Sequence, residues 1–347
     1  MTTPRLVTLL RVLALIVVVV SVTVFAPVRL FVAWLAPLPD DIPTQLQQAL
    51  DYGFDGVILY AETKGKPART YTAGWHNRSE KIPARPDALF KIASIGKLYT
   101  AVAITKLIAA NKLAADSTLS EHFPHLAQRL PNADTITVSM LVQHRSGLAN
   151  FTNTNDFWLT AHGLSDQQKL ELVLDLPANF APGSQYQYSN TNYLLLDQII
   201  ARVSGSSKFE YIQQSILTPL SLTNTYNSLH DIDISRIMAG YYVGIDEDIT
   251  AADYGSMLAS AEDVGIFVRA LNDGSLLSQQ ERQLYSSLYV YQHTGLIPGY
   301  QSLALYDKET DTVLVIFVNT TNFSDDNYWA LFELLGRRVK QILAKQG

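Results

Sequence analysis

The chain has 347 residues and a formal net charge of −6, and 48% of its residues are hydrophobic. This length suits one large domain or two interleaved ones with a sizeable core, and the composition is that of a globular protein. The acidic balance argues against nucleic acid as a partner, because nucleic acid binding needs a basic face. The chain has no cysteine, which removes disulfides, thiol chemistry and a lipid-modified N-terminal cysteine.

Residues 1–36 form a predicted N-terminal signal or membrane anchor. Arg5 and Arg11 precede an apolar run over 12–26 that suits the core of a signal peptide, whereas 12–36 is long enough to span a bilayer if Arg29 snorkels. We favour the uncleaved anchor over the signal peptide, because Pro27 would hinder cleavage after residue 26. Both interpretations place the domain outside the cytoplasm, periplasmic or extracellular, and cleavage would make it secreted. A buried core helix is the remaining alternative.

The main domain is predicted over 43–347, after a linker at 37–42. Strand patterns occupy both ends of this domain and helical patterns fill its middle. The predicted strands are 56–61, 68–73, 288–292, 300–306 and 312–319. The predicted helices are 42–50, 94–110, 139–144, 166–175, 191–203, 208–217, 260–272 and 325–345.

This order of elements predicts an α/β fold of the α+β type. One antiparallel sheet is built from both chain ends, about 43–90 and 288–347, and terminal helices flank it. A mostly helical subdomain, about 91–287, is inserted between the two halves. A site would then lie in the cleft between the sheet and the inserted part.

Ser94 and Lys97 are the first candidate catalytic residues. They lie three residues apart, so on a helix both side chains leave the same face. A free serine hydroxyl is a poor nucleophile, and a lysine held beside it in a dry pocket can accept its proton. A serine in the first turn also places its own backbone N–H where it can help to hold an oxyanion.

Two further motifs are predicted to reach the same cleft. Tyr188 and Asn190 precede a helix, and a tyrosine phenol beside a lysine ammonium can exist partly as phenolate and so take a serine proton. His293, Thr294 and Gly295 are expected at the end of a strand, where the glycine lets a substrate lie against the strand edge. A third stretch, 141–148, turns at a glycine, and we interpret it as a packing corner.

Taken together and in this order, the three motifs resemble the serine beta-lactamase and penicillin-binding family. The resemblance covers about 43–340 and is closest to the branch of class C beta-lactamases, D-alanyl-D-alanine carboxypeptidases and esterases. It implies that Ser94 is the acylated nucleophile, Lys97 its proton partner and Tyr188 the base. It further implies that Asn190 contacts the substrate and the lysine, that 293–295 form the strand wall, and that the backbone N–H of Leu296 completes the oxyanion hole.

One departure from the family pattern affects the expected activity. Beta-lactamases of this branch usually carry Lys-Thr-Gly where this chain has His293, so a permanent cation that would clamp a substrate carboxylate is replaced by a mostly neutral ring. This favours an esterase or a D-Ala-D-Ala carboxypeptidase-like peptidase over a strong beta-lactamase.

The expected partner is a small-molecule or peptide substrate, with a cell-wall peptide among the candidates, and the resemblance implies no cofactor and no metal. The alternatives are a penicillin-binding or sensing module that acylates with little turnover, a weak beta-lactamase, and a non-catalytic scaffold. Specificity is expected in the loops 149–165 and 228–254.

Overall fold

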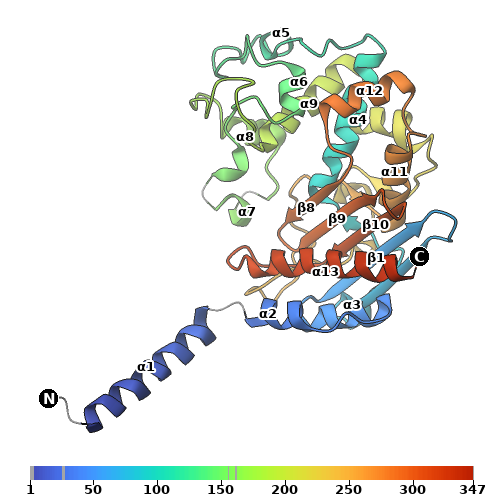
Figure 1. Ribbon diagram of the computed structural model, residues 1–347. Coiled ribbons are helices and arrows are strands. Elements are labelled where there is room, and N and C mark those ends of the chain that lie inside the picture. The colour runs from blue at the N-terminus through green and yellow to red at the C-terminus, as the bar shows by residue number, and fades with distance from the viewer. Residues whose placement is uncertain (1–3, 26–27, 155, 161, 347) are drawn as a thin grey trace.

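The computed structural model describes residues 4–25, 28–154, 156–160 and 162–346 (Figure 1). A six-stranded sheet, ordered β3-β2-β1-β10-β9-β8, forms its centre, and every neighbouring pair of strands is antiparallel. Its strands are β1 Gly56–Thr63, β2 Arg69–Asn77, β3 Ile82–Pro83, β8 His293–Ile297, β9 Tyr300–Asp307 and β10 Thr312–Val318. Strands from the two chain ends meet where β1 pairs with β10, so the predicted fold class is confirmed.

Helices cover both faces of this sheet. On one face, α3 (Ile42–Asp51) and α13 (Asn327–Lys345) pack against the sheet and bury an apolar cluster that includes Leu46, Ile316 and Leu335. The other face packs against α11 (Ala261–Asp273), and its core continues into α4 (Gly96–Ala109) and α9 (Asn190–Ser204). This second core connects the sheet to the inserted helical part, so the chain has two apolar layers separated by one sheet.

The remaining helices lie mainly in the inserted part and around it, with short strands between them. The α-helices are α5 Leu119–His122, α6 Val138–Val142, α7 Phe157–Thr160, α8 Asp166–Glu171, α10 Lys208–Ile212 and α12 Gln279–Leu288. A π-helical turn, Gln213–Leu217, continues α10. Short strands β4 Phe90–Lys91, β5 Thr225–Tyr226 and β7 Leu258–Ala259 form a small sheet, and β6 Tyr241–Tyr242 pairs with β11 Thr320–Thr321.

The N-terminal region contains two helices, α1 (Pro4–Phe25) and α2 (Val28–Leu35). Within the part of the chain that the structure describes, no helix is both long enough and apolar enough to cross a membrane. The candidate cleavage position at 26–27 lies outside the described residues. On α2, Ala33 is buried in the same apolar cluster as α13.

Residues at the predicted linker are held by an arginine of the last helix. The buried Arg338 guanidinium donates hydrogen bonds to the carbonyl oxygens of Ala36 (2.9 Å) and Pro37 (2.6 Å) and to Oε1 of Gln45 (2.6 Å). Asp41 then caps α3 by accepting a hydrogen bond from the backbone N–H of Thr44. The chain therefore enters the domain in a fixed position.

The prediction of a strand over 288–292 is wrong. Leu288 ends α12, and the strand begins only at His293, so the His-Thr-Gly motif starts β8 and does not follow a strand. The alternation of Tyr289 and Tyr291 imitates a strand pattern, but these rings pack on the core instead of pairing along a sheet edge.

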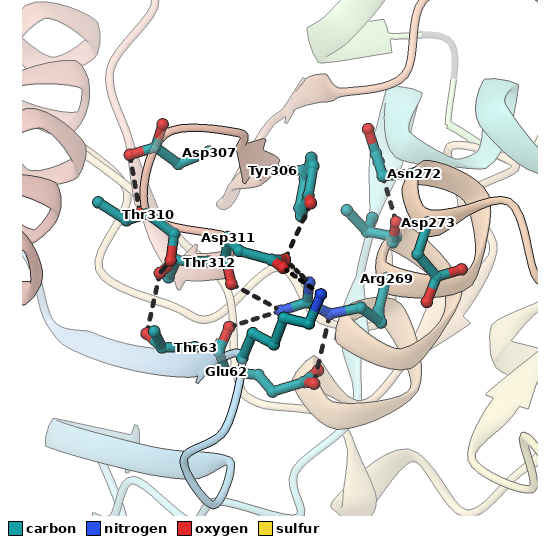
Figure 2. Close-up of polar contacts among 12 residues, drawn as sticks. Glu62, Thr63, Arg269, Asn272, Asp273, Tyr306, Asp307, Thr310, Asp311 and Thr312 are labelled. Atoms are coloured by element: carbon teal, nitrogen blue, oxygen red, sulfur yellow. Dashed lines mark hydrogen bonds and ion pairs between the residues drawn. The ribbon is translucent and has the colours of Figure 1, made fainter. Parts of the chain in front are cut away.

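A charged cluster fixes α11 to the sheet (Figure 2). Arg269 of α11 forms ion pairs with Glu62 at the end of β1 and with Asp311 in the turn between β9 and β10. Its Nη2 also donates to the backbone oxygen of Glu62 at 2.9 Å, and the Tyr306 hydroxyl donates to Asp311 Oδ1 at 2.8 Å. This cluster holds one end of the central strands against the helical layer.

Candidate active site

The turn that carries Ser94 has an unusual backbone. Ala93 begins a short 3₁₀ turn, Ala93–Ile95, that leads into α4, and its φ is +50°, in the left-handed region that costs a non-glycine residue roughly 1–2 kcal/mol. The surroundings hold this conformation, because the Ala93 N–H donates to Ser256 Oγ at 2.9 Å and Ser302 Oγ donates to the Ile92 carbonyl at 3.0 Å. A strained residue that is held from two sides is typical of a functional site.

Ser94, Lys97 and Tyr188 meet at one point. The Tyr188 hydroxyl donates to Ser94 Oγ at 2.8 Å, and Lys97 Nζ donates to the same oxygen at 3.2 Å. Lys97 Nζ also lies 5.1 Å from the centre of the Tyr188 ring. The amine of Lys97 on α4 and the phenol of Tyr188 before α9 are therefore both within hydrogen-bonding distance of the Ser94 hydroxyl.

Asn190 orients the lysine. Its Oδ1 accepts a hydrogen bond from Lys97 Nζ at 2.8 Å, while its Nδ2 donates to Thr152 Oγ1 at 3.1 Å. The backbone N–H of Asn190 donates to Asn150 Oδ1 at 3.0 Å. The amide orientation is thus fixed by 150–152, and the ammonium is directed at Ser94.

His144 lies behind the tyrosine, in the stretch that we interpreted from the sequence as a packing corner. Its ring centre is 4.4 Å from that of Tyr188, and its Nδ1 accepts a hydrogen bond from the Ser189 N–H at 3.2 Å. Burial, followed by the nearby charge of Lys97, lowers the pKa of His144 to about 3. A neutral imidazole therefore packs against the phenol of Tyr188. The sequence signal that could have indicated this position is its place beside a glycine turn.

His293 is neutral and fully engaged. Its Nε2 is 2.9 Å from the Tyr289 hydroxyl, and its Nδ1 contacts the backbone oxygen of Thr294. Burial is the main cause that lowers the pKa of His293 to about 4, although the contact with Thr294 opposes it. This side of the site therefore carries no cation near pH 7, as the sequence led us to expect.

Gly295 also has a packing role that the sequence did not indicate. A Cβ atom at this position would lie 2.3 Å from Ser302 Oγ, 2.5 Å from the Ile92 carbonyl oxygen and 2.9 Å from Ala93 Cβ. The absent side chain leaves space for the turn that carries Ser94 to approach β8. Thr294 and Leu296, on either side, both line the cavity above Ser94.

The cavity in front of Ser94 has a volume of about 440 Å³, a size typical of sites for small ligands. Sequence analysis missed most of its walls. The walls include the aromatic residues Phe157, Trp158, Tyr254 and Trp329 and the charged residues Asp166, Lys169, Asp197 and Lys208. Phe157 and Trp158 lie in the loop 149–165 and Tyr254 ends the loop 228–254, so both loops reach the cavity. In the described ranges, no group of three or more histidine, aspartate or glutamate side chains is arranged to hold a metal ion.

Comparison with known proteins identifies the family of this chain. The sequence profile of the Beta-lactamase family matches residues 35–290, which is most of the chain. The chain belongs to the beta-lactamase family. Its members are serine hydrolases, and the family range includes Ser94, Lys97 and Tyr188.

Relatives and solved structures are similar to the chain at low identity. Protein flp of Staphylococcus aureus is 25% identical over 80% of this chain, and the chain spans about three fifths (62%) of that protein. The putative penicillin-binding protein PbpX of Bacillus subtilis is 27% identical over 78% of this chain and 72% of its own length.

Among structures, D-amino acid amidase from Ochrobactrum anthropi SV3 has a TM-score of 0.77 at 24% identity, over 88% of this chain and 97% of that one. A penicillin-binding protein from Bacillus halodurans has a TM-score of 0.68 at 22% identity, over 83% of this chain and 98% of that one. At these identities the structures support the fold alone.

Proposed function

We propose that this protein hydrolyses an ester or amide through an acyl-enzyme on Ser94. The observation that carries the proposal is the convergence on Ser94 Oγ of the Tyr188 hydroxyl at 2.8 Å and Lys97 Nζ at 3.2 Å. A positioned base beside a serine is what nucleophilic catalysis requires. The family membership supports hydrolysis in general, and the arrangement around Ser94 supports these residues as its agents.

In the proposed mechanism, Tyr188 acts as a phenolate stabilised by the Lys97 ammonium. Ser94 Oγ attacks the substrate carbonyl carbon as its proton passes to the Tyr188 oxygen. The tetrahedral oxyanion is held by the backbone N–H groups of Ser94 and Leu296. The leaving group departs with the proton from Tyr188, and the acyl group remains on Ser94. A water molecule then attacks the acyl-enzyme ester and gives a proton to Tyr188. The tetrahedral intermediate collapses, the bond from Ser94 Oγ to the acyl carbon breaks, and Ser94 Oγ takes that proton back from Tyr188 as the acid product leaves.

We propose an esterase or a D-amino acid peptide or amide hydrolase in preference to a beta-lactamase, within the branch of class C beta-lactamases, D-alanyl-D-alanine carboxypeptidases and esterases. The neutral, fully engaged His293 supports this choice, because the site lacks a permanent cation at that position. PbpX among the relatives, a putative penicillin-binding protein, supports amide-bearing substrates, including cell-wall peptides. The second candidate, a penicillin-binding module with little turnover, uses the same acylation step.

We propose that the catalytic domain lies outside the cytoplasm, either attached to the membrane through residues 1–36 or secreted after cleavage. The order of Arg5 and Arg11 before an apolar run supports export, as do the exposed side chains of Leu9, Leu13 and Ile16. Fractionation of cells that express the full chain tests this, together with the N-terminal sequence of the mature protein. Recovery of the intact chain in the cytoplasmic fraction would contradict it.

A substrate panel tests the hydrolase function. It consists of p-nitrophenyl esters, a D-Ala-D-Ala peptide and nitrocefin, assayed with the wild type and with Ser94→Ala. We expect turnover of an ester or the peptide that Ser94→Ala abolishes, and little turnover of nitrocefin. A long-lived adduct with fluorescent penicillin and negligible ester hydrolysis would favour the penicillin-binding alternative. The absence of both an adduct and turnover would favour a scaffold.

A further inference from the structure

The charges that line the cavity are not equally compensated. Besides Lys97, two lysines line it: Lys169 of α8 and Lys208 of α10. Lys208 Nζ lies 2.7 Å from Asp197 Oδ2, and the two side chains are similarly covered, at 22% and 26% exposed. Lys208 therefore has a close counterion in the same environment.

Lys169 differs from Lys208 in the distance to its counterion and in how far the two paired side chains are covered. Its side chain is only 11% exposed, and its contact within the described residues is a long one, 3.4 Å from Nζ to Asp166 Oδ1. The Asp166 side chain is 60% exposed, so water screens that carboxylate, whereas most of the lysine side chain is covered by protein. A buried charge is stabilised only by close and complete pairing, and the Lys169 ammonium has three donors. An anion within the cavity would complete its pairing.

The position of Lys169 connects it to the nucleophile. A Cβ atom on Gly255 would lie 2.9 Å from Lys169 Nζ, so the ammonium lies directly over that glycine. The next residue, Ser256, accepts the hydrogen bond from the Ala93 N–H, and Ala93 precedes Ser94. Gly255 and Ser256 both line the cavity. One small ligand can therefore reach Ser94 and the ammonium together.

His293 cannot take the place of this cation. A backbone carbonyl oxygen only accepts, so the contact with Thr294 requires the proton on Nδ1, and Nε2 then accepts from the Tyr289 hydroxyl. No N–H group of the imidazole remains for a substrate. Because Lys97 is engaged by Ser94 and Asn190, Lys169 is the cation best placed to bind an anionic group in the cavity.

We propose that Lys169 binds a carboxylate of the substrate. The substrate class is then an amide or ester that carries an anionic carboxylate group in addition to the bond that is hydrolysed. This inference rests on the proposed hydrolase function and adds the charge of the substrate to it. It also places the carboxylate receptor on α8 and not on β8, where the family pattern would have it.

A binding experiment tests this inference without relying on turnover. In a Ser94→Ala background, the probes are two pairs of small amides: glutaramate with neutral glutaramide, and N-acetylglycine with neutral N-acetylglycinamide. Glutaramate carries its carboxylate on the acyl side of the amide bond, and N-acetylglycine carries it on the amine side. Binding is measured by calorimetry, or by fluorescence of Trp158 in the cavity wall. We expect at least one anion to bind more tightly than its neutral partner, and Lys169→Met to weaken that anion about 10- to 100-fold while leaving the neutral amide unchanged, as expected for loss of a charge-assisted hydrogen bond.

The controls separate charge from folding and from catalysis. Lys208→Met removes a cation of the same cavity and should keep the preference for the anion, and Lys169→Arg should restore most of it. Lys169→Gln serves as a second neutral variant if Lys169→Met unfolds, as judged by thermal denaturation. Equal binding of anion and neutral amide in the parent, or an anion preference that survives both neutral Lys169 variants, would overturn the inference. Failure of the hydrolase function would instead appear as wild-type protein that turns over neither an ester nor the D-Ala-D-Ala peptide.

Discussion

His144 should make the protein sensitive to acid. This histidine is 1% exposed, and its pKa is lowered from about 6.5 to about 3, first by burial and then by the charge of Lys97. In the unfolded chain the imidazole regains its ordinary pKa. Between pH 6.5 and 3 the unfolded state therefore binds one proton that the folded state does not, and stability falls as the pH falls.

The size of the effect follows from linkage. One proton bound only in the unfolded state costs about 1.4 kcal/mol of unfolding free energy per pH unit, so acidification from pH 6.5 to pH 5 should cost about 2 kcal/mol. His144→Asn removes this titration. Asparagine suits the site, because it tolerates the φ of +55° at this position and its Oδ1 can accept the hydrogen bond from the Ser189 N–H.

Urea unfolding between pH 7 and pH 5, followed by far-ultraviolet circular dichroism, measures the effect. The variant loses ring packing and should be less stable at pH 7, so the readout is the slope of unfolding free energy against pH and not its value. We expect the slope of His144→Asn to be lower than that of the wild type by about one proton near pH 5. His125→Asn, a change at an exposed histidine, is the matched control. An unchanged slope in His144→Asn would refute the reasoning.

Three further variants test the surroundings of the site and the sheet. Gly295→Ala should lower kcat for an ester substrate strongly and lower the melting temperature, because its Cβ would lie 2.3 Å from Ser302 Oγ; wild-type kcat would contradict the close approach of β8 to the nucleophile turn. Gly96→Ala should raise the unfolding free energy by about 0.5–1 kcal/mol in urea titrations, because its Cβ meets only ordinary contacts in the first turn of α4. The hydrogen bond from Tyr306 is the main cause that lowers the pKa of Asp311, so the wild type should lose more stability than Asp311→Asn as the pH falls below 5. An equal loss of stability below pH 5 in the wild type and in Asp311→Asn would argue against a contribution of the Asp311 carboxylate to stability.

The sequence predicted the sheet and the pair of Ser94 and Lys97 because each depends on local patterns. The helical spacing of Ser94 and Lys97 survives in the structure, although Ser94 lies in a 3₁₀ turn ahead of α4. Tyr188 and Asn190 could be assigned to the same site only through the family resemblance, since no local rule brings residues 94 positions apart together.

Other features depend on tertiary contacts that no local pattern encodes. The strand pattern at 288–292 fails because Tyr289 is placed by its contact with His293 and by the core, not by a sheet neighbour. Gly295 is required by a backbone that approaches from another part of the chain. The roles inferred for His144 and Lys169 both arise from burial. Burial makes the His144 imidazole a neutral packing partner of Tyr188, and it leaves Lys169 a cation with incomplete pairing.

The rate of acylation in Tyr188→Phe tests the proposed mechanism most directly. Rapid mixing with a p-nitrophenyl ester, followed by mass spectrometry of the intact protein and of its peptides, locates the acyl group and gives the rate at which it forms. We expect the adduct on Ser94 in the wild type, and a rate lower by about 10²- to 10⁴-fold in Tyr188→Phe, the range for loss of an acid-base group. An adduct on another residue, or an unchanged rate in Tyr188→Phe, would contradict the account.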